Sequence, residues 1–393
     1  MLTSTLSEFQ GALLDVGQAI VHDQLALGCL VACPESRLAE LQQAIERLAA
    51  EVGSVIEVSE VSEARYEEWV AASGQPQLIL TLLSGGDLTI ALNAVSRITH
   101  QHGLNIDTVR RLSHRVPLSE LGAHRSAFVE IRVRGLAKDL EAVRADLMRA
   151  ADQQNFDFSM QQDNVYRRNR RLVAFDMDST LIDAEVIDEL ATLHGVGEQV
   201  AGVTARAMAG ELDFKQSFTE RVKLLRGLSA DALETVARSV RLNPGAARLF
   251  QVLKHFGYTT AVISGGFQYV GNHLKEELGI DYVFANDLVI EDGLITGEVR
   301  GEIVDAARKA ERLRELAALQ GIAIQQTIAI GDGANDLPML STAGLGVAYH
   351  AKPVVQASAR HAISNFGLDA VLYLMGFSDS DLNEVYSSSV VKS

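Results

Sequence analysis

The sequence predicts a doubly wound α/β domain in its C-terminal part, preceded by smaller modules in which helices cover an antiparallel sheet. Before about residue 165, strand-like runs alternate with amphipathic helices, without clusters of reactive side chains. From Arg171 onward, apolar buried-type strands alternate with helices, a pattern typical of a parallel sheet. A chain of 393 residues is also too long for one ordinary core, which favours roughly two to four domains.

The stretch 77–162 predicts one complete module. Its expected strands cover 77–83, 104–112, 126–133 and 156–161. After the first strand, apolar residues from Leu88 to Ile98 recur at helical spacing, and Gly103 ends the helix. The second expected helix carries Leu136, Leu140, Val143 and Leu147. This βαββαβ order indicates a ferredoxin-like unit, in which two helices lie on an antiparallel sheet.

The same order recurs upstream, in a module 1–62 that lacks its first strand. A short helix is expected near Leu6 and a longer one near Leu41. The expected strands lie near 11–21, 25–33 and 54–60. We therefore predict an internal duplication, with the segment 63–76 as the linker between the two modules.

Tandem modules of this order resemble ACT domains, which bind small amino acids in regulated enzymes of amino-acid metabolism. The resemblance implies an amino-acid effector and a homodimer. The loop Ser84-Gly85-Gly86-Asp87 fits the ligand loop of such domains, although a glycine-rich turn between strand and helix has many uses. A region that only mediates dimerisation is therefore an open alternative.

The composition narrows the choice of partners. Hydrophobic residues make up 47% and charged residues 22% of the chain, as in ordinary globular proteins. The net charge of −16 argues against a nucleic-acid partner, because nucleic-acid recognition needs concentrated Lys and Arg. No stretch is long and apolar enough to span a membrane, and the N-terminal residues lack the pattern of a signal peptide. We therefore expect a cytoplasmic protein.

The two cysteines, Cys29 and Cys33, lie in one strand-like run. Four residues along a strand separate their backbones by about 13 Å, which is too far for a disulfide. Two cysteines without a His/Cys cluster also do not make a structural zinc site. We expect both to be buried core residues, as unpaired cysteines usually are.

An acidic cluster follows the first strand of the predicted parallel sheet. The strand 171–175 leads directly into Asp176-Met177-Asp178-Ser179-Thr180. Carboxylates two residues apart can reach the same edge of a sheet. One can act as a nucleophile and the other as a general acid and base. A solvated turn would use the same residue types, so this cluster alone leaves both interpretations open.

A second acidic cluster follows the strand 327–331. It reads Gly331-Asp332-Gly333-Ala334-Asn335-Asp336. Asp332 and Asp336 are four residues apart at the start of a helix and share a face. Oxygen ligands of this kind suit Mg²⁺, and carboxylates placed together without a cation would repel each other. The cluster favours a magnesium site over a simple polar turn.

Two further residues could bind phosphate. Ser264 ends the strand 258–264 and is followed by two glycines and a helix, whose N-terminal N–H groups favour anions. Lys309 lies early in a helix that Asp305 opens. Taken singly, Ser264 could be a helix cap and Lys309 a solvated surface residue.

In their order along the chain, these features resemble the four motifs of the haloacid dehalogenase superfamily. The resemblance covers about 170–375 of the predicted catalytic domain 165–393, and it implies a Rossmann-like core. It implies that Asp176 attacks phosphorus, while Asp178 protonates the leaving alkoxide and then activates water. Ser264 and Lys309 would hold the phosphoryl oxygens.

The same resemblance implies a set of ligands for Mg²⁺. The Asp176 carboxylate, the backbone carbonyl of Asp178 and Asp332 would bind the ion. Asn335 and Asp336 would support them.

Residues 185–240 lack strand character and read as helices. They resemble the small helical cap of phosphoserine phosphatases, as does the predicted hairpin 286–304. The substrate-binding residues that this family resemblance implies are Glu185, Met208, Phe214, Arg221, Ser264, Gly265, Lys309 and Asn335. In that family the Glu meets the substrate ammonium and the Arg its carboxylate, which suits the bidentate geometry of a guanidinium. The implied reaction releases L-serine from O-phospho-L-serine as the last step of serine biosynthesis, with L-serine as the candidate effector.

Three alternatives to this function follow from the residues. A related enzyme could act on another phosphorylated amino acid or transfer the phosphoryl group to an alcohol. A phospho-accepting signalling module also combines acids, Mg²⁺, Ser/Thr and Lys, but the built-in acid Asp178 favours turnover. A catalytically silent amino-acid sensor is disfavoured because all four motifs are complete.

Overall fold

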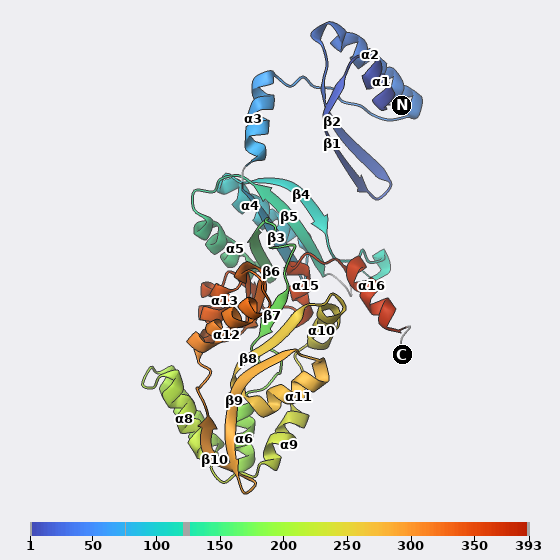
Figure 1. Cartoon of the computed structure of the whole chain (residues 1–393). Coiled ribbons are helices and arrows are strands. Elements are labelled where there is room, and N and C mark those ends of the chain that lie inside the picture. The colour runs from blue at the N-terminus through green and yellow to red at the C-terminus, as the bar shows by residue number, and fades with distance from the viewer. Residues whose placement is uncertain (1, 75, 121–125, 391–393) are drawn as a thin grey trace. The chain divides into compact units, whose positions relative to one another are not determined.

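The computed structural model describes residues 2–74, 76–120 and 126–390. The chain divides into two compact units, Met1–Gly74 and Gln75–Ser393, and Figure 1 labels most of their elements.

The first unit is a short α+β module. Its elements are α1 (Leu2–Glu8), β1 (Ala12–Val21), β2 (Gln24–Ala32), α2 (Glu35–Val52) and α3 (Glu63–Ser73). One prediction for this unit was wrong, and the predicted linker has a structure of its own. Residues 54–60 form no strand, because their alternating apolar residues have no neighbouring strand to pair with. The predicted linker 63–76 is largely the helix α3, which starts where the Ser62 hydroxyl accepts the Arg65 N–H.

The β1–β2 hairpin of this unit leaves many apolar side chains exposed. The exposed members are Leu13, Leu14, Val16, Ile20, Val21, Leu25 and Leu27. Cys29 is exposed and Cys33 is half-buried, so the prediction of two core cysteines was wrong. A two-stranded sheet has too little partner surface to bury its own apolar side chains, which accounts for this exposure.

The second unit opens with a complete βαββαβ module. Its elements are β3 (Gln77–Ser84), α4 (Leu88–Gln101), β4 (Asn105–Arg111), β5 (Ala127–Arg134), α5 (Leu140–Gln154) and β6 (Phe156–Gln162). The strands lie in the order β6-β3-β5-β4 and are all antiparallel, which confirms the predicted ferredoxin-like arrangement. Asp87 and Asp139 cap the two helices by accepting N–H groups of their first turns. Leu136, predicted inside the second helix, lies before it and is exposed.

A parallel sheet forms the core of the rest of this unit. Its strands are β7 (Leu172–Phe175), β8 (Thr259–Phe267), β9 (Tyr282–Glu291), β11 (Thr327–Gly331), β12 (Leu345–Tyr349) and β13 (His361–Ile363). They lie in the order β9-β8-β7-β11-β12-β13. All five neighbouring pairs are parallel. This is the doubly wound topology that the sequence predicts, and its strand order reverses between β7 and β11. A site is therefore expected where these two strands end.

Helices cover both faces of this sheet. Val173, Phe175 and Ile330 belong to the apolar core on the side of α10 (Ala246–His255) and α11 (Gln268–Leu278). Leu172 and Ala329 point into the core on the opposite side. That second side is formed by α12 (Ala306–Leu319), α13 (Leu337–Thr342) and α14 (Pro353–Ser358). Two more helices, α15 (Val371–Leu374) and α16 (Asp379–Val390), follow β13. The alternation of side chains along each strand thus fills both layers.

The second module and the core share one continuous sheet. β13 pairs with β6 in antiparallel register, with His361 opposite Ser159 and Ala362 opposite Phe158. With β10 (Leu294–Arg300), the described part of this sheet has eleven strands in the order β10-β9-β8-β7-β11-β12-β13-β6-β3-β5-β4. From the sequence this module is predicted to be separate from the catalytic domain, because neither β6 nor β13 alone indicates the pairing.

A helical cap follows the first core strand. It consists of α6 (Val186–His194), α7 (Gly197–Met208), α8 (Phe214–Leu224) and α9 (Asp231–Ser239). The strand β9 continues from the core into the hairpin with β10 (Leu294–Arg300), which in Figure 1 lies among α6, α8 and α9. An isolated bridge between Ser229 and Leu294 joins the hairpin to the cap. The cap is therefore attached to the core both by its two chain ends and by this hairpin.

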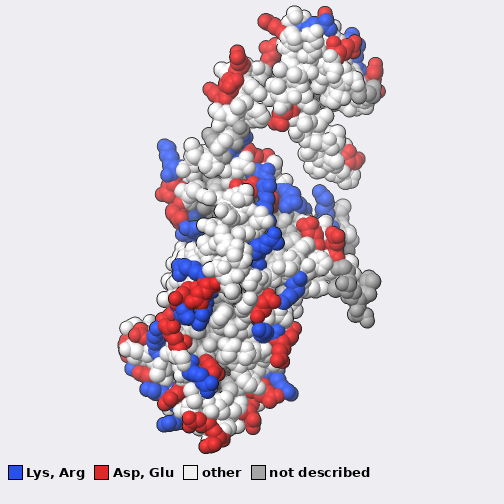
Figure 2. All heavy atoms as spheres, in the orientation of Figure 1, with Lys and Arg blue, Asp and Glu red and all other residues white. Residues whose placement is uncertain are grey.

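Within the described ranges, no helix has both the length and the apolar character that crossing a membrane requires. Figure 2 shows Lys and Arg side chains interspersed with Asp and Glu over the face in view.

Candidate active site

The loop after β7 carries the first acidic cluster. Asp176 is buried, and its Oδ1 accepts the N–H of Met177 at 2.8 Å. Its own N–H donates to the carbonyl of Ile330 on the neighbouring strand β11 at 2.8 Å. The strand pairing thus fixes the backbone of Asp176 at the point where the strand order reverses.

Asp178 lies two residues further along this loop. Its Oδ1 is buried and, among the described residues, has no hydrogen-bond partner. Burial, together with the charges of Glu185 and Asp176, raises the pKa of Asp178 well above its ordinary value. A Cβ placed on Gly266 would lie 2.6 Å from Asp178 Oδ2, so a residue without a side chain is required there. These surroundings therefore favour the protonated form of the Asp178 carboxyl group.

Lys309 connects the two acidic clusters. Its side chain is fully buried, and its Nζ lies 2.8 Å from Asp176 Oδ2 and 2.7 Å from Asp336 Oδ1. Burial lowers the pKa of Lys309, but the two carboxylates outweigh this effect and raise the pKa above its ordinary value. Lys309 projects from the first turn of α12, where the Asp305 side chain accepts the Arg308 N–H at 2.9 Å.

The carboxylates of Asp176, Asp332 and Asp336 form a group whose nearest oxygens all lie within 4.8 Å of one another. Burial and the nearby Asp176 raise the pKa of Asp332 to about 6 and that of Asp336 to about 7. One ammonium does not offset three carboxylates in this space, and a divalent cation would. Oxygen donors are also the ligands that Mg²⁺ prefers. The residues therefore fit a divalent metal ion.

The second acidic cluster is held by its own hydrogen bonds. Thr180 donates its hydroxyl to Asp332 Oδ1 at 2.7 Å, which ties this cluster to the first. The Gly333 N–H donates to Asp336 Oδ2 at 2.9 Å. Asn335 is half-buried beside them. Asp336 thus already has Lys309 and a backbone N–H as partners, which favours a supporting position over a direct ligand.

The end of β8 provides a cluster of small polar groups. Ser264 is buried, and its Oγ accepts the Gly266 N–H at 3.0 Å. Asn286, which was not singled out from the sequence, holds this segment: its Nδ2 donates to the Gly265 carbonyl at 2.8 Å, and its Oδ1 accepts the Val304 N–H at 2.9 Å. A hydroxyl and N–H groups at this sheet edge suit phosphoryl oxygens.

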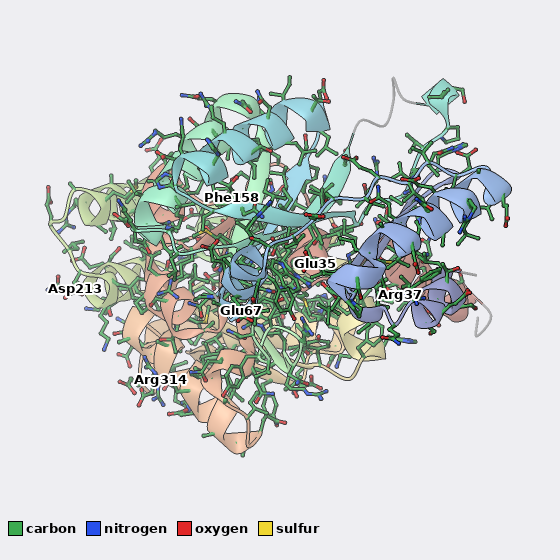
Figure 3. The ribbon with its side chains drawn as sticks, turned by 90° about the horizontal axis from the view of Figure 1, so that it is seen from above. Glu35, Arg37, Glu67, Phe158, Asp213 and Arg314 are labelled. Carbon is green, nitrogen blue, oxygen red and sulfur yellow. The ribbon has the colours of Figure 1, made fainter. Side chains whose placement is uncertain are left out.

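The cap adds an apolar side chain above these groups. Asp213, labelled in Figure 3, starts α8 through a capping box with Gln216. The following Phe214 lies so close to Gly265 that a Cβ there would be 2.9 Å from the ring atom Cζ. A salt bridge of 3.0 Å between Lys215 and Asp305 also joins the cap to the core. The start of α8 therefore closes over the end of β8.

The cap also contributes a pair of opposite charges. Glu185 accepts the Ser179 hydroxyl at 2.8 Å. Burial raises the pKa of Glu185 and lowers the pKa of Arg221. Each group shifts the pKa of the other back towards its ordinary value, as neighbouring opposite charges do. Arg221 Nε is buried without a hydrogen-bond partner in the described part of the chain. A buried guanidinium nitrogen of this kind calls for an anionic partner.

Most residues predicted for the site from the sequence converge here, and Met208 does not. The Met208 side chain is 72% exposed at the end of α7, and no described contact joins it to the other site residues. Two residues that sequence reasoning missed, Asn243 and Asn286, are amides that hold the loops of the site. Single polar residues between apolar runs give no signal that would identify them.

Comparisons with known proteins agree with this architecture. Residues 1–59 match the ACT domain family, and residues 173–341 match the haloacid dehalogenase-like hydrolase family. A phosphoserine phosphatase from Streptomyces coelicolor is 40% identical over 385 residues, which are 97% of this chain and 89% of that protein.

Two solved structures are also similar. A haloacid dehalogenase-family hydrolase from Salmonella enterica serovar Typhi has a TM-score of 0.65 and 33% identity, covering 76% of this chain and 98% of its own. A phospho-aspartyl intermediate analogue of phosphoserine phosphatase has a TM-score of 0.50 and 42% identity, covering 52% of this chain and 99% of its own. The chain therefore belongs to the phosphoserine phosphatase family of haloacid dehalogenase-like hydrolases.

Proposed function

We propose that this chain is a Mg²⁺-dependent phosphatase that hydrolyses O-phospho-L-serine to L-serine and phosphate. The observation that carries the proposal is that two kinds of groups lie together near the ends of the core strands β7, β8 and β11. The Asp176 carboxylate lies near a buried carboxyl group with a raised pKa, Asp178, and beside the buried ammonium of Lys309, and this set can transfer a phosphoryl group. In the cap, Glu185 and Arg221, whose Nε has no hydrogen-bond partner among the described residues, can bind the two charged groups of an amino acid.

The reaction has two steps. An oxygen of Asp176 attacks phosphorus, the bond from phosphorus to the serine oxygen breaks, and Asp178 gives its proton to that oxygen. Asp178 then takes a proton from water, whose oxygen attacks the aspartyl phosphate and releases phosphate from Asp176. Lys309 and Ser264 hold the phosphoryl oxygens throughout.

Mg²⁺, when bound, would offset the charges of the phosphoryl group and the carboxylates. Asp176, Asp332 and the backbone carbonyl of Asp178 would hold it, with Asn335 and Asp336 in support. Phosphate release from a panel of phospho-amino acids and sugar phosphates, with and without Mg²⁺, tests the proposal. Preference for a sugar phosphate, or full activity after chelation, would contradict it.

Substrate selectivity is expected to depend on the charged pair in the cap. For Arg221→Ala and Glu185→Gln we expect kcat/KM for O-phospho-L-serine to fall about 10- to 100-fold, because each change removes one charge-assisted contact. Hydrolysis of an aryl phosphate, which has neither ammonium nor carboxylate, should change less than about threefold. Arg238→Ala is the control, since Arg238 is an exposed cap residue paired with Glu234. Equal losses on both substrates would mean that the pair only supports the cap fold.

The N-terminal modules 1–62 and 77–162 are proposed to regulate the catalytic domain 165–393 and to form a homodimer. The exposed apolar surface of the β1–β2 hairpin supports this, because such surface marks a contact with another chain. We expect the full chain to be dimeric and Val16→Lys, at a side chain that is 54% exposed, to shift it to monomer in size-exclusion chromatography with light scattering. Val354→Lys, at an apolar residue of α14 that is even more exposed, should stay dimeric. A dimeric Val16→Lys variant would contradict this interface.

L-serine is the proposed effector, near the loop 84–87. The Ser84 Oγ accepts the Gly86 N–H at 3.3 Å, and Gly85 lies against Phe366 of the core, so a change in this loop reaches the catalytic part directly. L-serine should therefore lower kcat as well as raise KM in steady-state assays of the full chain. Purely competitive inhibition would mean that serine acts only as a product at the active site.

A further inference from the structure

The segment 240–245, which returns the chain from the cap to the core, packs along the loop 176–183 that carries both catalytic carboxyl groups. The Asn243 N–H donates to the Leu181 carbonyl at 2.8 Å. An antiparallel bridge next to it pairs Leu242 with Ile182. Backbone hydrogen bonds therefore hold the return segment, residues 240–245, against the nucleophile loop, residues 176–183.

The Asn243 side chain adds two contacts at the tightest point of this loop. Its Nδ2 donates to the carbonyl oxygens of Ser179 at 3.2 Å and Thr180 at 2.9 Å. Ser179 has a φ of 57°, in the left-handed region that residues with a Cβ rarely adopt. A backbone in this conformation persists only where its surroundings hold it. Asn243 is the side chain that holds both of these carbonyls, between Asp178 and Glu185.

The segment 364–369 fixes the position of Asn243 by contacting the two residues that follow it. The neighbouring Pro244 carbonyl accepts the Leu368 N–H at 2.8 Å. Gly245 is packed so tightly that a Cβ would lie 2.2 Å from Asp369 Oδ1. Residues 367–369 thus form the surface on which the return segment rests.

The first residues of the segment 364–369 are held by the second module. Asp157 on β6 is only 5% exposed, and it accepts three hydrogen bonds from the segment. The donors are the Ser364 N–H at 3.0 Å, the Asn365 N–H at 2.9 Å and the Asn365 side-chain amide at 2.9 Å. The next residue, Phe158, labelled in Figure 3, lies opposite Ala362 in the β6–β13 pairing. One carboxylate of the second module therefore organises the segment that supports Asn243.

We propose that Asn243 is a positioning residue of the phosphatase reaction, and that Asp157 sets its position from the second module. Asn243 holds the nucleophile loop in the shape that directs Asp176 and Asp178 to the substrate. Asp157 acts on the same loop through the segment 364–369. The proposal rests on the proposed function only for the identity of the substrate, since any phosphate ester would use the same two carboxyl groups.

The first test is Asn243→Leu, which keeps the size of the side chain and removes both donors. We expect kcat to fall about 10- to 100-fold on both O-phospho-L-serine and an aryl phosphate, because a displacement of about 1 Å can cost this much. KM for both should stay within about threefold, unlike the selective loss expected for Arg221→Ala. A variant with a lower melting temperature but a kcat within about twofold of the unaltered chain would show a purely structural role and overturn the proposal. If the unaltered chain releases phosphate from the aryl phosphate and not from O-phospho-L-serine, the proposed function fails, while the aryl phosphate still tests Asn243.

The second test compares Asp157→Asn with Asp163→Asn in the full chain. Asp163 directly follows the last strand of the second module and its side chain is similarly buried, but it pairs with Arg132 and Arg168. We expect Asp157→Asn to lower kcat about 3- to 10-fold on both substrates at unchanged KM, the range seen for coupling between remote sites. Asp163→Asn should stay within about twofold. Equal effects of the two changes, or an unchanged kcat for Asp157→Asn, would overturn the link to the second module.

Discussion

Asp176→Asn is expected to leave a folded protein that releases almost no phosphate. The amide cannot form the bond to phosphorus, so we expect kcat to fall by at least about three orders of magnitude, as for other nucleophile replacements. The fold should persist, because Lys309 retains Asp336 as a partner at 2.7 Å. In metal-free buffer the change also removes one of three neighbouring carboxylates, so the melting temperature should not decrease.

Phosphorylation of the unaltered chain with labelled substrate, followed by peptide mapping, gives the direct measurement. The label should lie on Asp176 and be absent from the Asn variant. Asp183→Asn is the matched control, since Asp183 is exposed in the same loop and should leave turnover unchanged. Label on a serine or a histidine would exclude the aspartyl-phosphate mechanism.

The sequence predicts the catalytic core well because its signals are local. Apolar strands ending in Asp176, Ser264 and Asp332 indicate parallel strands, and the ends of such strands meet at one edge of the sheet. Convergence of these side chains therefore follows from their positions at strand ends. The order of the core strands adds the reversal point between β7 and β11, which lies between the two acidic clusters.

The features that were predicted wrongly or missed share one cause. Each depends on a contact with a segment that is distant in the sequence, or on the lack of such a contact. Residues 54–60 alternate like a strand, but a strand needs a partner, and in the described structure they pair with neither β1 nor β2. Cys29 has the apolar neighbours of a core residue, yet its side chain is exposed on the β1–β2 hairpin. The Asn243 contacts and the β6–β13 pairing join segments that lie 63 and about 200 residues apart, as the spacings Asn243–Thr180 and His361–Ser159 show. Tertiary pairings of this kind leave no periodicity in the sequence.

The second large effect is expected for Lys309→Met, because Lys309 is the fully buried cation between two carboxylates. Removing one member of a buried ion pair leaves the other charge without compensation, which typically costs about 3–5 kcal/mol of unfolding free energy. Methionine fills most of the space of the lysine stem, so the loss should come from the charge and not from a cavity. Catalysis should fall further, because the ammonium that would contact the phosphoryl oxygens is gone.

We therefore expect Lys309→Met to lower the free energy of unfolding in urea by about 3–5 kcal/mol and to reduce kcat at least about 100-fold. Lys254→Met is the matched control: its Nζ lies 3.3 Å from Asp281 Oδ1, but both side chains are more than one third exposed. Such a pair contributes only about 0.2–1 kcal/mol, since water already stabilises its charges. Adding Asp336→Asn to Lys309→Met removes one of the two uncompensated carboxylates and should restore part of the stability without restoring turnover. If Lys309→Met and Lys254→Met are equally stable, the buried ammonium does not offset the acidic cluster, and the assigned balance of charge in the site is wrong.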